Sequence, residues 1–287
     1  MSAYHHRVMT FADLADACAR RASRKVELPG GSGNLSQDIG TEPAVEWDDK
    51  FGWKGAVTAV RKGWNAGNQT VRAALDMQTT EDSIDGTWDA DVCGQYVDVA
   101  AYVAGQPDCM MRKGSAPAPR RVRLVLSSGM IASVDAQDAV QYATAAAGFA
   151  AMLIGQGLDV AITSLYVGTD DSRIVTIPVT VKEYGQEPDA SRIAFSTHPA
   201  FLRRVLFAVR ELDPEMPFRM RSGGYGRTCY DWQSRDLIRD AIPDADGETL
   251  ICLPGIMQLD SCHTAGKFLE GFLHAARKQA TTEGGAP

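Results

Sequence analysis

The stretch that decides the fold is RVRLVLSSGMIASVDAQDAV, residues 121–140. Its first part concentrates Val and Leu over a short run, which is typical of a buried strand. The run ends in Ser127, Ser128 and Gly129, and Asp135 then stands where a helix N-cap is expected. The stretch predicts a strand, a turn and a helix. The serine turn has three interpretations: a catalytic site, a metal site, or a structural connection.

The elements that follow predict a layered α/β domain. A helix over residues 135–157 leads into a second apolar strand at 158–168, so the two strands should be parallel. Residues 173–184 predict a hairpin partner, and Pro178 predicts that this third strand lies at a sheet edge, because proline cannot donate to the ladder. The remaining pattern predicts a helix, a strand and a helix over residues 198–212, 248–256 and 261–279.

The chain before this domain is less periodic. Residues 1–118 predict a smaller, mainly helical region with a flexible Gly-, Ser- and Pro-rich loop at 28–43. The Pro- and Ser-containing stretch at 112–121 predicts the boundary to the α/β domain at 119–280, and residues 281–287 predict a disordered tail. The predicted fold class is α/β: a mostly parallel sheet with an antiparallel edge strand, flanked by helices.

Composition limits the function classes. The 287 residues carry a formal net charge of −7, which disfavours general nucleic-acid binding because neutralising phosphates needs Lys and Arg. No apolar run reaches the roughly 18 residues of a membrane helix, and the Ala-rich run at 143–155 predicts a buried helix instead. The N-terminus lacks the apolar centre of a signal peptide, which predicts a cytoplasmic protein. The six cysteines form no CxxC pair and predict free thiols.

The order of elements resembles the first two-thirds of a von Willebrand factor A-like domain. In that family the loop after the first strand carries an Asp-x-Ser-x-Ser metal site. The equivalent loop here is SSGMIAS, residues 127–133, which lacks the aspartate, and Leu253, Pro254 and Gly255 stand where an acidic residue often follows the fourth strand. The resemblance implies an incomplete domain whose metal site is degenerate.

A second resemblance covers more of the chain. The segments RKGWNAG (61–67), DVCGQYVDVAAYVAGQPDCM (91–110) and STHPAFLRRVLFAVREL (196–212) resemble those of an uncharacterised family encoded by tailed phages and prophages. This resemblance implies a viral origin and a place in the host cytoplasm or the virion. It implies no mechanism.

The serine turn is the first candidate site along the α/β domain. A nucleophile elbow reads Gly-x-Ser-x-Gly, and LSSGM lacks the first glycine. The turn is therefore predicted to be structural, or to be a binding rim made of Ser127, Ser128, Gly129 and Ser133. The alternative is a Mg²⁺ site, for which the following carboxylates lie near predicted strand ends: Asp135, Asp170 and Asp260.

Two further segments are candidate binding sites. His198 is expected to cap a helix, with Arg203 and Arg204 on the outward, solvated side; the alternative has them face an acidic or phosphate-bearing partner. The loop RMRSGGYGRTCYDW at 219–232 mixes arginines, glycines and aromatics, which suits binding a peptide or single-stranded nucleic acid. It equally suits a packed surface loop. Its candidate binding residues are Arg219, Arg221, Tyr225, Arg227, Tyr230 and Trp232.

No complete catalytic constellation is present in the sequence. We therefore expect a non-enzymatic protein-binding or assembly protein that uses no cofactor and no membrane, and whose partner is another protein or a second copy. One alternative is a metal-dependent hydrolase or phosphoryl-transfer enzyme that uses Mg²⁺ at the sheet rim. The other is a protein that binds single-stranded nucleic acid through residues 219–232.

Overall fold

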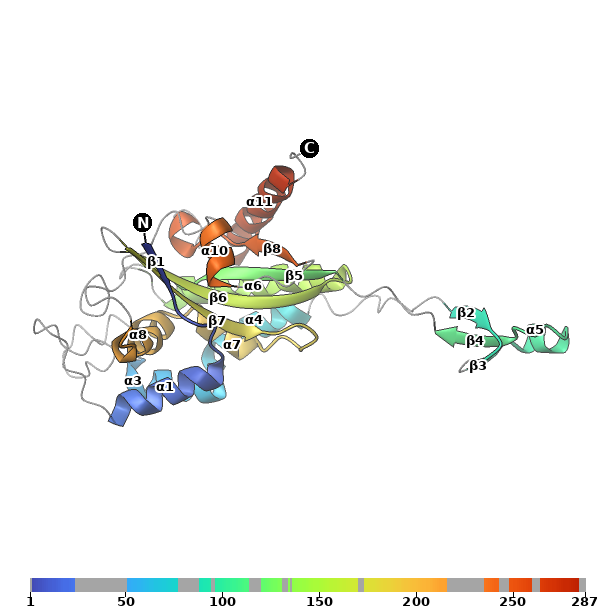
Figure 1. The fold of residues 1–287 in the computed structure, drawn as a ribbon, viewed down its shortest axis with the longest axis horizontal. Helices are drawn as coiled ribbons and strands as arrows, with labels where there is room; N and C mark the ends of the chain where they lie inside the picture. The colour runs from blue at the N-terminus through green and yellow to red at the C-terminus, as the bar shows by residue number, and fades with distance from the viewer. Residues whose placement is uncertain are drawn as a thin grey trace, which may run out of the picture.

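A computed structural model describes most of the chain. The described residues are 2–23, 51–76, 88–93, 96–113, 120–130, 134, 136–169, 173–215, 235–242, 248–259 and 264–283. Figure 1 shows a curved sheet with helices packed against it, and a small second sheet that lies apart from it. The predicted loop at 28–43 lies outside the described residues, and residues 281–283 of the predicted tail belong to the last helix.

The main sheet has five strands in the order β1-β7-β6-β5-β8. They are β1 (Ser2–His5), β5 (Arg121–Ser127), β6 (Asp159–Thr169), β7 (Arg173–Lys182) and β8 (Thr249–Cys252). The central strand β5 is parallel to β6 and to β8, whereas β6 and β7 form an antiparallel pair. Helix α6 (Ala136–Gly155) connects β5 to β6. The predicted parallel β-α-β unit and the antiparallel hairpin are both confirmed.

The prediction that β7 lies at a sheet edge is wrong, because β1 pairs with it in parallel. Pro178 is nevertheless accommodated for the expected reason. The His6 amide donates to the Thr176 carbonyl and the Met9 amide donates to the Pro178 carbonyl, each at 2.9 Å, so the missing Pro178 N–H also faces this side. The Pro178 nitrogen lies between these two hydrogen bonds, opposite the part of the chain that follows β1. Pairing between the N-terminal segment and β7 resumes at Met9, which bridges to Val179 just beyond the proline.

One face of the sheet is covered by helices from both halves of the chain. Besides α6 they include the following: α1 (Phe11–Ser23), α3 (Gly52–Lys62), α4 (Asn65–Asp76), α7 (Ala190–Ser196), the π-helical segment η1 (Phe201–Leu206), α8 (Phe207–Leu212) and α11 (Ala265–Glu283). A single apolar core joins Leu14 of α1, Val71 of α4 and Phe201 with Leu124 and Ile162 of the sheet. Residues before the predicted boundary therefore belong to the same core as those after it.

The opposite face has a separate, smaller core. Leu237 and Ile238 of α10 (Arg235–Ala241) pack with Val125 of β5, Leu165 of β6 and Leu250 of β8. Because side chains alternate along a strand, Leu124 and Val125 face opposite cores, and β5 is buried on both sides. Burial on both faces explains why the run at 121–127 is so apolar.

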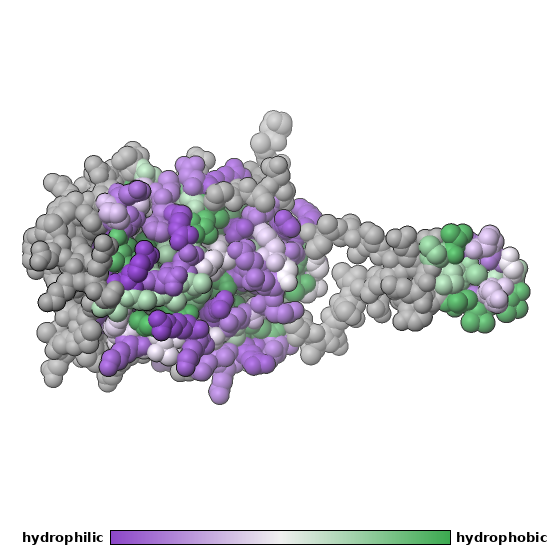
Figure 2. All heavy atoms as spheres, turned by 60° about the horizontal axis from the view of Figure 1, so that its bottom comes forward, coloured by the Kyte–Doolittle hydropathy of each residue, from purple (hydrophilic) through white to green (hydrophobic). Residues whose placement is uncertain are grey.

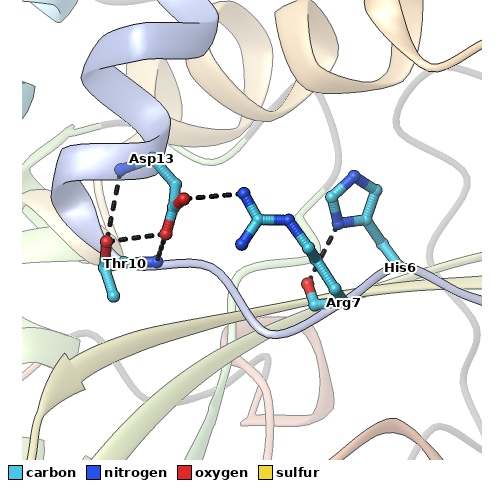
Figure 3. Close-up of polar contacts among 4 residues, drawn as sticks. All are labelled: His6, Arg7, Thr10 and Asp13. Carbon is cyan, nitrogen blue, oxygen red and sulfur yellow. Dashed lines mark hydrogen bonds and ion pairs between the residues drawn. The ribbon is translucent and has the colours of Figure 1, made fainter.

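A polar cap begins helix α1, as Figure 3 shows. The Thr10 amide donates to Asp13 Oδ2 at 2.8 Å, and the Asp13 amide donates to the Thr10 hydroxyl at 3.2 Å. Arg7 donates to Asp13 Oδ1 at 2.7 Å. The hydrogen bonds from Thr10 and from Arg7 lower the pKa of Asp13 to about 2. These contacts form a capping box, which fixes the residue at which α1 begins.

Strand β8 is the other edge of the sheet. Its Cys252 amide donates to Gln279 Oε1 of α11 at 3.1 Å, and Gln279 Nε2 donates to the Cys252 carbonyl at 2.8 Å. The side-chain amide thus supplies both contacts that a further strand would make at this residue. Blocking an open edge in this way opposes pairing with another chain.

The small sheet lies at the end of what we call the arm, residues 88–113. It consists of β2 (Trp88–Asp91), β3 (Tyr96–Val97) and β4 (Met110–Lys113) in the antiparallel order β2-β4-β3, together with the one-turn helix α5 (Val99–Val103). Figures 1 and 2 both place the arm apart from the main body, by which we mean the other described residues. None of the helices in the described ranges has the length and apolarity needed to cross a bilayer.

Candidate functional site

The serine turn lies at the carboxyl end of β5. The Ser128 amide donates to the Leu165 carbonyl at 3.1 Å, and the Gly129 amide donates to Ser127 Oγ at 3.3 Å. Ser128 is fully buried, and its hydroxyl has no hydrogen-bond partner among the described residues. No histidine or carboxylate in the described ranges hydrogen-bonds either serine. The visible contacts are those of a strand that leads into a turn.

The neighbouring segments of this rim also serve the fold. The Leu253 amide donates to the Val125 carbonyl at 3.0 Å, and the Tyr142 hydroxyl donates to the Pro254 carbonyl at 3.0 Å. Leu253 is fully buried. Burial raises the pKa of Tyr142, so its hydroxyl keeps its proton and remains a donor. The segment 253–255, which lacks the expected acidic residue, therefore packs in the core and hydrogen-bonds to β5 and α6.

Most of the other predicted rim residues cannot be placed. Ser133, Asp135, Asp170 and Asp260 lie outside the described residues, and so does the whole loop at 219–232. Among the residues that are described, no three His, Cys, Asp or Glu side chains gather in a way that could hold a metal ion. The Mg²⁺ alternative therefore stays a prediction.

His198 is a buried core residue that caps a helix. Its Nδ1 accepts from the Ala200 amide at 3.0 Å, and its ring lies 4.4 Å from the Trp64 ring and 4.6 Å from the Phe51 ring, measured between centroids. Burial, with a smaller effect from Arg203, lowers the pKa of His198 to about 3. The ring is therefore neutral near pH 7, with its proton on Nε2. Because the side chain is fully buried, a binding partner cannot reach it from the solvent.

The prediction that Arg203 and Arg204 are solvated is wrong. Each is only 2% exposed. They lie on η1, where the π-helical turn shifts the side-chain register from the 3.6-residue period that the prediction assumed. Helices α1 and α3 also pack against η1, so this segment is covered on more than its sheet side.

Sequence analysis missed two buried polar contacts of α8, one with α1 and one with β6. Arg21 Nε donates to Glu211 Oε2 at 2.6 Å, with both side chains fully buried. Arg210 donates to the Tyr166 hydroxyl at 2.9 Å. A Cβ at Gly168 would lie 2.4 Å from that hydroxyl oxygen, so the glycine makes room for the phenol. The sequence did offer a signal: Arg210 and Glu211 stand in a helical stretch, residues 201–212, that is apolar on more than one face, and such a helix is expected to be buried.

The arm presents the opposite kind of surface. Its exposed apolar side chains are between 47% and 78% accessible. They are Val92, Val97, Val99, Tyr102 and Val103. Figure 2 shows the corresponding hydrophobic colour on the arm, while the visible described surface of the main body is mostly hydrophilic. Within the described residues, every large apolar side chain that is exposed belongs to the arm.

A local hydrogen-bond network holds this apolar surface in place. The Asp98 carboxylate accepts from the Ala100 and Ala101 amides at 3.0 and 3.1 Å, which caps α5. The Asp98 amide donates to the Cys109 carbonyl at 2.8 Å and closes the segment between β3 and β4. Val99, Tyr102 and Val103 lie at positions i, i+3 and i+4 of α5, so they share one face. The site was missed because the sequence shows only a short apolar run here.

The fold and the surface together define a mixed α/β protein whose arm carries the exposed large apolar side chains of the described residues. A family model described as "Domain of unknown function (DUF7192)" matches residues 3–261, and the chain belongs to that family. The match spans the arm as well as most of the main body. No curated protein matches the chain. No solved structure matches it either.

Proposed function

We propose that this chain is a non-enzymatic protein-binding protein and that the arm is its binding surface. The observation that carries the proposal is the location of all exposed large apolar side chains of the described residues on the arm. Contiguous apolar surface on a monomer usually marks a site of interaction. At the rim of the main sheet, by comparison, the Ser127 and Tyr142 hydroxyls make hydrogen bonds that serve the fold.

The size of the arm supports the same proposal. A three-stranded sheet gains independent stability from a hydrophobic face or from packing against a helix. No residue of α5 is buried. Five exposed side chains of this size present on the order of 500 Å². The largest apolar patch on a typical monomer is about 300–600 Å², so the arm alone reaches the range that is often functional.

The likeness to von Willebrand factor A-like domains and the phage or prophage origin belong to the same proposal. The parallel pairing of β5 with β6 and the antiparallel pairing of β6 with β7 support the likeness. The resemblance of residues 61–67, 91–110 and 196–212 to phage-encoded proteins supports the origin. The second of these segments lies within the arm, which supports a role of the arm in phage assembly or host takeover. The genes that flank the coding sequence test the proposed origin: neighbouring phage genes would support it, and their absence would contradict it.

The experiment that tests the proposed function removes the arm. Residues 88–113 are replaced by a short Gly-Ser linker, and both forms are used to capture proteins from infected and uninfected cells. We expect the intact chain to retain a partner in fixed proportion and the shortened chain to lose it, with an unchanged thermal unfolding midpoint for the main body. Equal capture by both forms would refute the assignment of the arm as the binding surface.

A further inference from the structure

We infer that the partner of the arm is the same surface on a second copy of this chain. The inference rests on the proposed function, since it names the occupant of the same site. The surface in question is the face of α5 formed by Val99, Tyr102 and Val103, together with the other two exposed valines of the arm, Val92 and Val97.

The distribution of apolar surface favours a second arm over the main body as the partner. An apolar face loses the most contact with water when the surface against it is also apolar. In the described main body the large apolar side chains are buried or at least half-buried, because they fill or border the two cores on either side of the sheet. In the described part of the molecule, only another arm offers a matching surface.

The shape of the contact suits a two-fold dimer. In such a dimer each copy contributes the same patch, so an apolar face complements itself. A strip with residues at i, i+3 and i+4 of a helix can lie against an identical strip that runs in the opposite direction. The arm carries this strip away from the main bodies in Figures 1 and 2, so two arms can meet without contact between the bodies.

The area of the patch sets the expected strength. Two patches of about 500 Å² would bury on the order of 1,000 Å² in total, below the roughly 1,200 Å² at which stable interfaces begin. The dimer should therefore be weak and depend on protein concentration. Each copy carries a net charge of −7, so the copies repel one another. Salt screens this repulsion, and dimerisation should strengthen as NaCl is added.

The test is sedimentation velocity of the full chain across a wide range of concentration, at low and at high NaCl. Val99→Asp with Val103→Asp places two charges on the patch and should abolish the dimer. Val99→Ala with Val103→Ala keeps α5 intact, since Ala is the better helix former, and should weaken dimerisation about tenfold or more. The matched control is Gln69→Asp, which adds a charge at an exposed position of α4 and should leave dimerisation within about twofold of the unchanged chain.

The outcomes separate this inference from the proposed function. A dimer that is lost or weakened by both arm variants, kept by the control and strengthened by salt supports the inference. A dimer that survives both arm variants lies on another surface and overturns it. A chain that is monomeric at every concentration also overturns it; the proposed function then stands only if the arm captures a different protein. If the arm captures nothing either, both are refuted.

Discussion

The main body and the arm solve the same folding problem to different extents. Strand β5 is buried on both faces, by helices on one side and by α10 on the other. Strands β2, β3 and β4 instead belong to a sheet whose helix α5 has no buried residue. The main body therefore buries its apolar side chains on both faces of the sheet, whereas the arm keeps apolar side chains exposed.

The largest expected effect comes from the buried ion pair of the main body. Glu211→Ala leaves Arg21 beside an empty site in a fully buried environment. Breaking a buried pair by removing one partner typically costs about 3–5 kcal/mol of unfolding free energy. Urea unfolding measures this loss. The control is Glu215→Ala at an exposed position beyond the end of α8, for which we expect a change below about 0.5 kcal/mol. A loss below about 1 kcal/mol for Glu211→Ala would show that this pair does not hold α1 on α8.

The second prediction concerns acid. The folded pKa of His198 is about 3, below its ordinary value of 6.5, so the unfolded chain binds the proton first as the pH falls. Its stabilising contribution is complete above pH 6.5, falls by about 2 kcal/mol at pH 5, and continues to fall towards pH 3. Unfolding free energy measured against pH should therefore decline less steeply in His198→Gln than in the unchanged chain. His274→Gln alters an exposed histidine and should keep the original slope. Equal slopes for both variants would mean that His198 titrates normally in the fold.

The third prediction concerns the cap of α1. Asp13→Asn removes the charge that accepts from Arg7 and from the Thr10 amide, and should cost about 1 kcal/mol near pH 7. Because the folded pKa of Asp13 is about 2 and its ordinary value is 3.8, its contribution is present above pH 3.8 and is lost as the pH falls towards 2. The difference between the two chains should therefore shrink as the pH falls below 3.8 and approach zero once the pH has passed below 2. A difference that persists there would assign the cost to geometry and not to charge.

The smallest expected effect is on the other side of the contrast. Val103→Ala removes apolar surface that is already 78% exposed in the single chain. We expect a change below about 0.5 kcal/mol in the unfolding of the main body, measured by urea at a protein concentration where the chain is monomeric. A loss of several kcal/mol would mean that Val103 packs within its own chain, and the arm would then resemble the main body.

The parts that could be predicted from sequence are those with a strong local pattern. The apolar run at 121–127 and the long helix after it predict the centre of the sheet, because burial on both faces needs continuous apolar sequence. Residues 2–5 carry no such pattern, and β1 forms only because β7 offers a free edge. Arg203 and Arg204 were misplaced because a π-helical turn is not visible as a period. The arm was missed as a site because strands of two to four residues give too little alternation to recognise.

The most direct test of the contrast is amide hydrogen exchange of the full chain, measured peptide by peptide at low and at high protein concentration. We predict that exchange in residues 96–113 slows as the concentration rises, while β5, β6 and α6 are strongly protected at every concentration. Exchange in the arm that is already slow at the lowest concentration, or that stays fast at the highest, would contradict the account.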